Sequence, residues 1–151
     1  MGQKQENIIR DFLAAWGDET QRPDVDKIVA MFAPDGQWTL YVPNGPVIRG
    51  REALRAEIER QLGYVAWTQC DLLHIVSDER RVVTERSDRF CKNGRVVAHQ
   101  LMAIFELDDD GLITAWREYF DLYDLARQSG SDPARLSGLE AARGRGEGRE
   151  T

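Results

Sequence analysis

The sequence is poor in the residues that build metal centres, disulfide frameworks and membrane spans. It contains 2 histidines and 2 cysteines, and Cys70 and Cys91 form no Cys-x-x-Cys pair. We interpret both cysteines as buried thiols, and we expect neither a metal ion nor another cofactor. No window reaches the roughly 18 consecutive apolar residues that a transmembrane helix needs, and the N-terminus lacks the basic and apolar regions of a signal peptide. We therefore expect a cytoplasmic protein without a membrane partner.

Basic residues are outnumbered and are not gathered in one place. The chain of 151 residues has 20 Lys and Arg against 26 Asp and Glu, which gives a formal net charge of −6. A nucleic-acid surface requires Lys and Arg clustered on one element, so we expect no nucleic-acid partner. The length is that of one domain with a single substantial core.

Three segments in the first half of the chain have apolar residues three or four positions apart, which is the spacing of an amphipathic helix. Their apolar stripes are Ile8, Ile9, Phe12, Leu13 and Trp16, then Val25, Ile28, Val29 and Phe32, and then Leu54, Ile58 and Leu62. The first helix should end near Gly17, the second should run from Pro23 to the turn residues 33–36, and the third should begin around Gly50 and end at Gly63.

The other segments favour β-strands. Residues 37–42 are rich in aromatic and β-branched side chains and precede a Pro-Asn-Gly-Pro turn, which predicts a strand followed by a short loop. Residues 66–76, 81–91, 95–107 and 112–121 are longer strand-type segments joined by short polar turns. Helices followed by an antiparallel meander indicate an α+β fold in which the sheet curls around the helices. We expect one domain over residues 1–128 and a flexible Gly/Arg/Glu-rich tail over residues 129–151.

Two of the predicted strands carry charged side chains among apolar ones on the same face. Alternate residues of a strand point to the same side, so Arg86 and Asp88 share a face with Phe90, and Glu118 shares a face with Phe120. If both faces line the interior of the sheet, a cation lies between two carboxylates, an arrangement in which buried charge is tolerated. The alternative is that Arg86 is a structural ion-pair centre or a surface residue.

The strings Thr-Glu-Arg-Ser-Asp at 84–88 and Gly-Leu-Ile-Thr-Ala-Trp-Arg-Glu-Tyr-Phe-Asp-Leu at 111–122 occur in an order that resembles the limonene-1,2-epoxide hydrolases. The resemblance extends from about Ile8 to Leu125. It implies a nuclear-transport-factor-2-like cone, with a curved mixed, mostly antiparallel sheet wrapped around three N-terminal helices.

The resemblance also implies a cofactor-free reaction that opens an epoxide in one step. In this family an arginine and an aspartate two residues apart act with an acidic residue on the last strand. Carried over here, Glu118 would be the general base that takes a proton from water. Asp88 would be the general acid that protonates the epoxide oxygen, and Arg86 would bridge the two carboxyl groups.

Four positions depart from the family pattern. The family usually has aspartate at the position of Glu118, and it holds the attacking water with a tyrosine and an asparagine where this chain has Trp38 and Leu40. An indole N–H donates one hydrogen bond and accepts none, and a leucine side chain does neither. His99 takes an aliphatic pocket position; it is either structural or a group that exchanges protons near neutral pH.

An apolar substrate pocket follows from the same resemblance. Its expected lining is Leu13, Trp16, Trp38, Leu40, Trp67, Phe90, Leu101 and Phe120. Apolar walls with a few polar groups are typical of a small-molecule site, and these suit a terpenoid- or polyketide-like molecule. Members of the superfamily commonly pair through the outer face of the sheet, so we expect a homodimer, with Val83, Val97 and Ile113 pointing outward.

Three functions are compatible with these residues. The first is an epoxide hydrolase that adds water to an apolar cyclic epoxide by general acid/base catalysis with Asp88, Arg86 and Glu118. The second is a polyketide cyclase, dehydratase or isomerase that uses the same pocket with His99. The third is a non-catalytic module that binds a small molecule.

Overall fold

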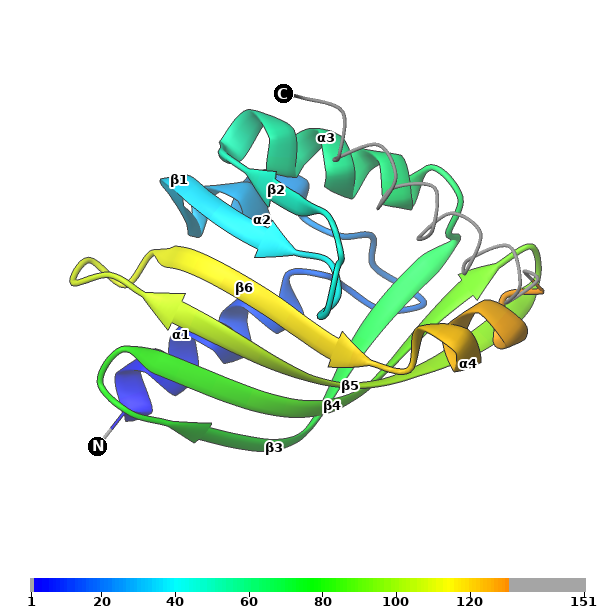
Figure 1. Ribbon diagram of the computed structural model, residues 1–151. Coiled ribbons are helices and arrows are strands. Elements are labelled where there is room, and N and C mark those ends of the chain that lie inside the picture. Colours follow the sequence, from blue (N-terminus) through cyan, green and yellow to red (C-terminus); the bar gives the residue numbers. More distant parts are fainter. Residues whose placement is uncertain (1, 131–151) are drawn as a thin grey trace, which may run out of the picture.

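The structure of the protein, a computed structural model, describes residues 2–130. The expected tail therefore lies outside the described residues except for its first two positions, and the domain boundary at residue 128 stays a prediction. The elements in chain order are α1 (Gln3–Ala14), α2 (Val25–Ala30), β1 (Phe32–Thr39), β2 (Val47–Arg49), α3 (Arg51–Leu62), β3 (Trp67–Ser77), β4 (Arg81–Lys92), β5 (Arg95–Leu107), β6 (Ile113–Phe120) and α4 (Leu122–Gln128). Figure 1 shows their arrangement.

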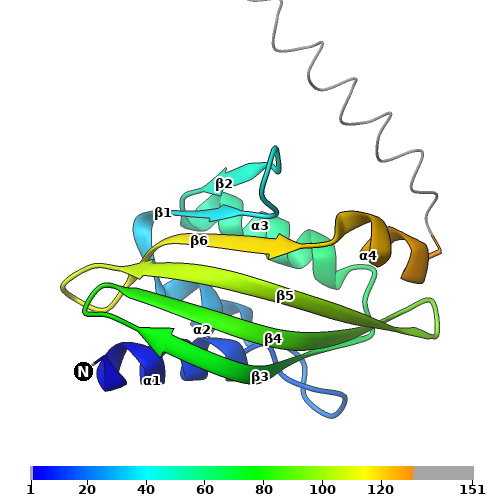
Figure 2. The same ribbon diagram turned by 60° about the horizontal axis from the view of Figure 1, so that its bottom comes forward.

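The strands form one six-stranded sheet in the order β2-β1-β6-β5-β4-β3. The β1–β6 pair is parallel and the other neighbours are antiparallel. The three N-terminal helices lie on one side of this curved sheet, and α4 follows β6 at one end (Figure 1 and Figure 2). The expected α+β architecture, a mixed and mostly antiparallel sheet with three N-terminal helices, is confirmed.

The centre of the core is Phe12 on α1, whose side chain is fully buried. Its ring makes edge-on contacts with Trp16, Phe32, Phe105 and Trp116, with ring centroids 5.1 to 6.2 Å apart. Edge-to-face geometry at these distances is favourable because the positive ring edge meets the negative ring face. The apolar stripe of α1 is thereby packed against the inner face of the sheet.

The second predicted helix is shorter than expected. It begins after Asp24, whose side chain accepts a hydrogen bond from the Lys27 N–H at 3.1 Å, and it ends at Ala30. Phe32, which we had assigned to this helix, instead begins β1 opposite Ile113. The residues predicted as a turn form a bulge in this strand, where a Cβ on Gly36 would lie 2.7 Å from the Ile113 carbonyl oxygen. Close parallel pairing with β6 therefore outweighs the local turn preference.

Other boundaries also differ. The first strand ends at Thr39 instead of residue 42, and part of the expected loop after it forms the short strand β2. The helix α4 was not predicted; Asp121 caps it by accepting a hydrogen bond from the Asp124 N–H at 3.0 Å. The outward positions expected for Val97 and Ile113 are wrong, because both are fully buried. None of the helices within residues 2–130 is long and apolar enough to cross a bilayer.

We predict that Phe12→Ala destabilises the fold by about 3–5 kcal/mol, the usual cost of truncating a fully buried phenylalanine to alanine. Urea unfolding followed by circular dichroism measures this change. Val47→Ala, at a position that is 52% exposed, is the matched control and should change the free energy of unfolding by less than about 0.5 kcal/mol. Similar losses in both variants would show that Phe12 is not central to the core.

Candidate active site

Two strands that are not neighbours supply the charged side chains. Arg86 and Asp88 lie on β4 and Glu118 lies on β6, with β5 between them. The β5 residue in register with Glu118 is Ala103, which is also in register with Thr84. Because alanine has only a methyl side chain, the space above β5 is free for the long side chains from both sides to meet. The structure thus brings the three expected charged residues together on the inner face.

Arg86 is the centre of the cluster. Its Nε donates to Asp88 Oδ1 at 3.1 Å, and its Nη2 donates to Asp88 Oδ2 at 2.9 Å and to Glu118 Oε2 at 3.2 Å. Nη1 donates to the Thr84 hydroxyl at 3.2 Å. Arg86, Asp88 and Glu118 are only 2%, 9% and 6% exposed. The guanidinium therefore holds two buried carboxyl groups through charge-assisted hydrogen bonds.

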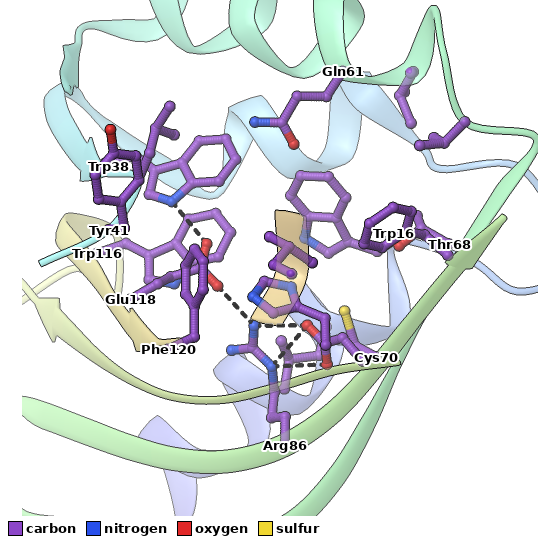
Figure 3. Close-up of a pocket in the computed structure, with 18 of the residues that line it drawn as sticks. Trp16, Trp38, Tyr41, Gln61, Thr68, Cys70, Arg86, Trp116, Glu118 and Phe120 are labelled. Atoms are coloured by element: carbon purple, nitrogen blue, oxygen red, sulfur yellow. Dashed lines mark hydrogen bonds and ion pairs between the residues drawn. The ribbon is translucent and has the colours of Figure 1, made fainter. Parts of the chain in front are cut away.

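Trp38 on β1 provides the second contact to Glu118. Its indole Nε1 donates to Glu118 Oε1 at 3.0 Å (Figure 3), and its ring is stacked on Trp116 with centroids 4.4 Å apart. Both oxygens of Glu118 therefore accept a hydrogen bond, one from the guanidinium and one from the indole. Trp38, which takes the place of a water-holding tyrosine in the resemblance, holds the carboxyl group itself.

Burial shifts the protonation of both acids. Desolvation raises the pKa of Glu118 to about 7, a shift that the charge of Asp88 increases and that Arg86 and Trp38 oppose. Desolvation also raises the pKa of Asp88, against the opposing effect of Arg86. Burial alone would lower the pKa of Arg86, but the carboxylates raise it above its ordinary value, so it stays cationic. Two coupled carboxyl groups around one cation can share a single proton near neutral pH.

The charged cluster lies in the wall of a cavity of about 260 Å³. Of the expected lining residues, the structure places these six in the wall: Leu13, Trp16, Trp38, Leu40, Phe90 and Phe120. Polar side chains that were not expected there are Tyr41, Gln61, Tyr64, Thr68 and Cys70. The cavity is therefore mainly apolar, with the acid pair and a few hydrogen-bonding groups in its wall.

Two expected lining residues do not line this cavity. Trp67 immediately precedes Thr68, which faces the cavity, so strand alternation turns Trp67 to the other side of β3. Leu101 is buried, at 4% exposure, but its register partners are Arg86 and Phe120. Leu101 therefore shares the inner face of the sheet with those residues without being part of the cavity wall.

His99 lines the cavity in register with Asp88. Burial lowers its pKa to about 4, and the positive charge of Arg86 adds to that shift. His99 is therefore neutral near pH 7, and a role for it in proton exchange stays a prediction. A neutral imidazole still offers one N–H donor and one acceptor lone pair.

Cys70 is a neighbour of the acid pair that the sequence did not identify. It is in register with Asp88, and its thiol hydrogen-bonds the Asp88 carboxyl group. Cys70 and Cys91 are both free and only partly buried, which corrects the expectation of buried thiols. Desolvation raises the pKa of Cys70 well above its ordinary value, so Cys70 stays a thiol. Within residues 2–130 no three His, Cys, Asp or Glu side chains gather as metal ligands would.

Comparison with known proteins defines the class to which the chain belongs. The family model of the SnoaL-like domain matches residues 9–116, and the chain therefore belongs to the SnoaL-like family. A solved NTF2-like protein of unknown function from Burkholderia pseudomallei has a TM-score of 0.71 at 19% identity, over 82% of this chain and 95% of that chain. The expected nuclear-transport-factor-2-like fold is confirmed.

Within this class, the chain is a distant homologue of epoxide hydrolases. The structure of a LEH-like epoxide hydrolase from Mycobacterium tuberculosis has a TM-score of 0.70 at 29% identity, over 92% of this chain and 94% of that chain. The epoxide hydrolase EphG of the same species is 36% identical over 78 residues, which are 52% of this chain and about half (51%) of that protein. The epoxide hydrolase/cyclase-like enzyme SalBIII has a TM-score of 0.70 at 20% identity, over 81% of this chain and 94% of its own, and so shares the fold.

We predict that the indole N–H of Trp38 reports the ionisation of Glu118. In proton–nitrogen correlation spectra its signal should move downfield as the pH rises through about 7, because a carboxylate is a stronger acceptor than a carboxylic acid. Glu118→Gln should abolish the movement. Glu85→Gln, on the same sheet but exposed, should leave it unchanged. A midpoint near the ordinary glutamate value would contradict the raised pKa.

Proposed function

We propose that the protein is a cofactor-independent epoxide hydrolase that adds water to an apolar cyclic epoxide of terpenoid- or polyketide-like structure. The observation that carries this proposal is the bridging of two buried carboxyl groups by one guanidinium in the wall of an apolar cavity. Homology to epoxide hydrolases supports it. The cavity of about 260 Å³ is slightly smaller than the usual range of about 300–1,000 Å³ for small-molecule sites, which favours a compact substrate.

The proposed reaction starts when the proton of the acid pair is on Asp88: Asp88 donates it to the epoxide oxygen while Glu118 takes a proton from water. The water oxygen forms a bond to one ring carbon as the bond from that carbon to the epoxide oxygen breaks. The product is a diol. The proton that Glu118 took from water then moves to Asp88, which restores the starting state of the acid pair. A pKa raised to about 7 makes Glu118 a stronger base than an ordinary glutamate, and general acid and base each contribute roughly 10²–10⁴ in rate.

Arg86 has a positioning and electrostatic role in this reaction. It remains cationic throughout, and its hydrogen bonds fix both carboxyl groups relative to each other. Since one proton is shared around it, the same cluster supplies an acid and a base at one pH. Apolar walls exclude bulk water and so strengthen these interactions.

A second candidate is favoured by Trp38 on β1 and by Leu40, which directly follows that strand. Trp38 already donates its only N–H to Glu118, and Leu40 has no hydrogen-bonding group, so neither offers an acceptor to orient an attacking water. A hydroxyl group on the substrate itself would need no such support. Ring closure of a hydroxy-epoxide, or a related cyclase, dehydratase or isomerase reaction, is therefore the alternative use of the same acid pair.

Incubation with a panel of cyclic epoxides in ¹⁸O-labelled water tests the proposal. We expect a diol that carries one label, and Asp88→Asn should reduce its formation by at least about 100-fold, the lower range for loss of a general acid. Glu85→Gln removes a carboxylate on the opposite face of the same strand and is the matched control, with activity close to that of the unmodified protein.

The other outcomes separate the alternatives. An unlabelled product would show that the protein catalyses ring closure or isomerisation and not hydrolysis. Binding of the epoxides without turnover would show that the protein is a ligand-binding module and not an enzyme for these epoxides. A larger rate in the triple variant Trp38→Tyr, Leu40→Asn, Glu118→Asp would support water as the nucleophile, since that variant restores the water-holding pattern.

We also propose that the protein forms a homodimer through the outer face of the sheet. Met102 and Tyr119 are in register there and are 50% and 45% exposed; large exposed apolar side chains of this kind mark interaction surfaces. Light scattering should give the mass of two chains, and Met102→Lys combined with Tyr119→Lys should give one. Val47→Lys, on the edge strand β2, is the control that should stay dimeric. A monomeric unmodified protein would disprove the proposal.

A further inference from the structure

Three cavity-lining residues have a ring nitrogen without a hydrogen-bond partner within residues 2–130, and two of these nitrogens lie outside the stacked aromatic core. These two are Trp16 Nε1 and His99 Nε2, and both atoms are enclosed. In Figure 3 the indole of Trp16 lies between Gln61 and the Arg86 guanidinium. A buried polar group without a partner destabilises the fold, so an unpaired nitrogen in a cavity wall calls for an explanation, and a polar atom of a ligand in the cavity would supply one. These two nitrogens therefore point to ligand chemistry that the acid pair does not use.

A third nitrogen of this kind has a different setting. Trp116 Nε1 also lacks a partner in the described part of the chain, but its ring is stacked between Trp38, at 4.4 Å, and Phe105, at 5.4 Å. Two stacked faces hold that indole within the aromatic core. Trp116 is therefore not part of the inference.

The orientation and charge of His99 are well defined. Its ring meets Phe120 edge-on, with centroids 4.3 Å apart at 85°. Its pKa of about 4 keeps the imidazole neutral, so that it can either donate or accept a hydrogen bond. Because His99 is the register partner of Asp88, the two backbones are only about 5 Å apart. An oxygen atom held by His99 would lie within a few bonds of the epoxide oxygen that Asp88 protonates.

We propose that this cavity recognises a second oxygen function of the substrate, a hydroxyl or carbonyl group, through His99 and Trp16. The inference rests on the proposed function only for the reaction at the epoxide and not for the binding itself. A hydroxyl oxygen can accept from the Trp16 N–H and donate to the His99 lone pair, and a carbonyl oxygen can accept from either ring. A hydrocarbon epoxide would leave both nitrogens unpaired. The preferred substrate is thus an oxygenated cyclic epoxide.

The test compares unreactive ligands of one skeleton, so that it does not depend on turnover. Menthol, menthone and p-menthane are titrated into the protein, and dissociation constants are measured from tryptophan fluorescence. We expect menthol or menthone to bind at least about tenfold more tightly than p-menthane, which corresponds to one net hydrogen bond. His99→Leu should remove the preference without weakening the binding of p-menthane. His99→Gln, which retains a donor and an acceptor, should restore part of it.

Each other result would overturn the proposal. Equal affinities for the three ligands, or no binding of any, would exclude an oxygen-recognising cavity. A preference that survives His99→Leu but disappears in Trp16→Phe would remove His99 from the subsite. A measurement on the unmodified protein does not depend on whether a variant folds. The nuclear magnetic resonance signals of the His99 imidazole nitrogens should shift when menthol is added and should not shift when p-menthane is added. Failure of the epoxide assay with a positive result here would disprove the hydrolase and leave the binding site intact.

Discussion

The arrangement of the site depends on the burial of one positive charge. Arg86 is almost completely removed from solvent, and the effective cost of burying an ion is several kcal/mol unless its partners are well placed. Asp88, Glu118 and Thr84 supply those partners from two strands. Because β5 lies between these strands, the small side chain of Ala103 is part of the same requirement. The curvature of the sheet and the helices behind it then exclude the solvent that would weaken the cluster.

The same burial that makes the cluster costly also gives it chemical properties. In water, two carboxyl groups beside an arginine would both be ionised at neutral pH, and no acid would be present. Desolvation raises the pKa of Asp88 and of Glu118, so one proton can remain on the pair. Its effect on His99 is the opposite, because burial disfavours the charged form of every group and the cation of a histidine is its protonated form. The cavity wall thus combines two carboxyl groups of raised pKa with a neutral imidazole.

Much of this arrangement could be predicted from the sequence, and its limits have physical causes. Strand alternation predicted one face for Arg86 and Asp88 and a similar face for Glu118, and the family resemblance combined the three into one site. Cys70 could not be found in this way, because β3 has a bulge between Leu72 and His74 that shifts the pairing counted from the hairpin turn. Phe32 fitted a helical stripe by spacing alone, but parallel pairing with β6 placed it in a strand. Non-local pairing of this kind leaves no local pattern.

The two departures at Trp38 and Glu118 belong together. Considered separately, a glutamate in place of an aspartate is too long by one methylene, and a tryptophan in place of a tyrosine has no acceptor for water. In the structure the indole N–H donates to one oxygen of that longer acid, Oε1, while Arg86 donates to the other, Oε2. Since Trp38 is also stacked on Trp116, its ring is a fixed donor that orients the carboxyl group. In the proposed reaction the longer acid is therefore compensated by a residue that positions the base directly, and the nucleophile would be oriented by the base and the substrate instead of by β1.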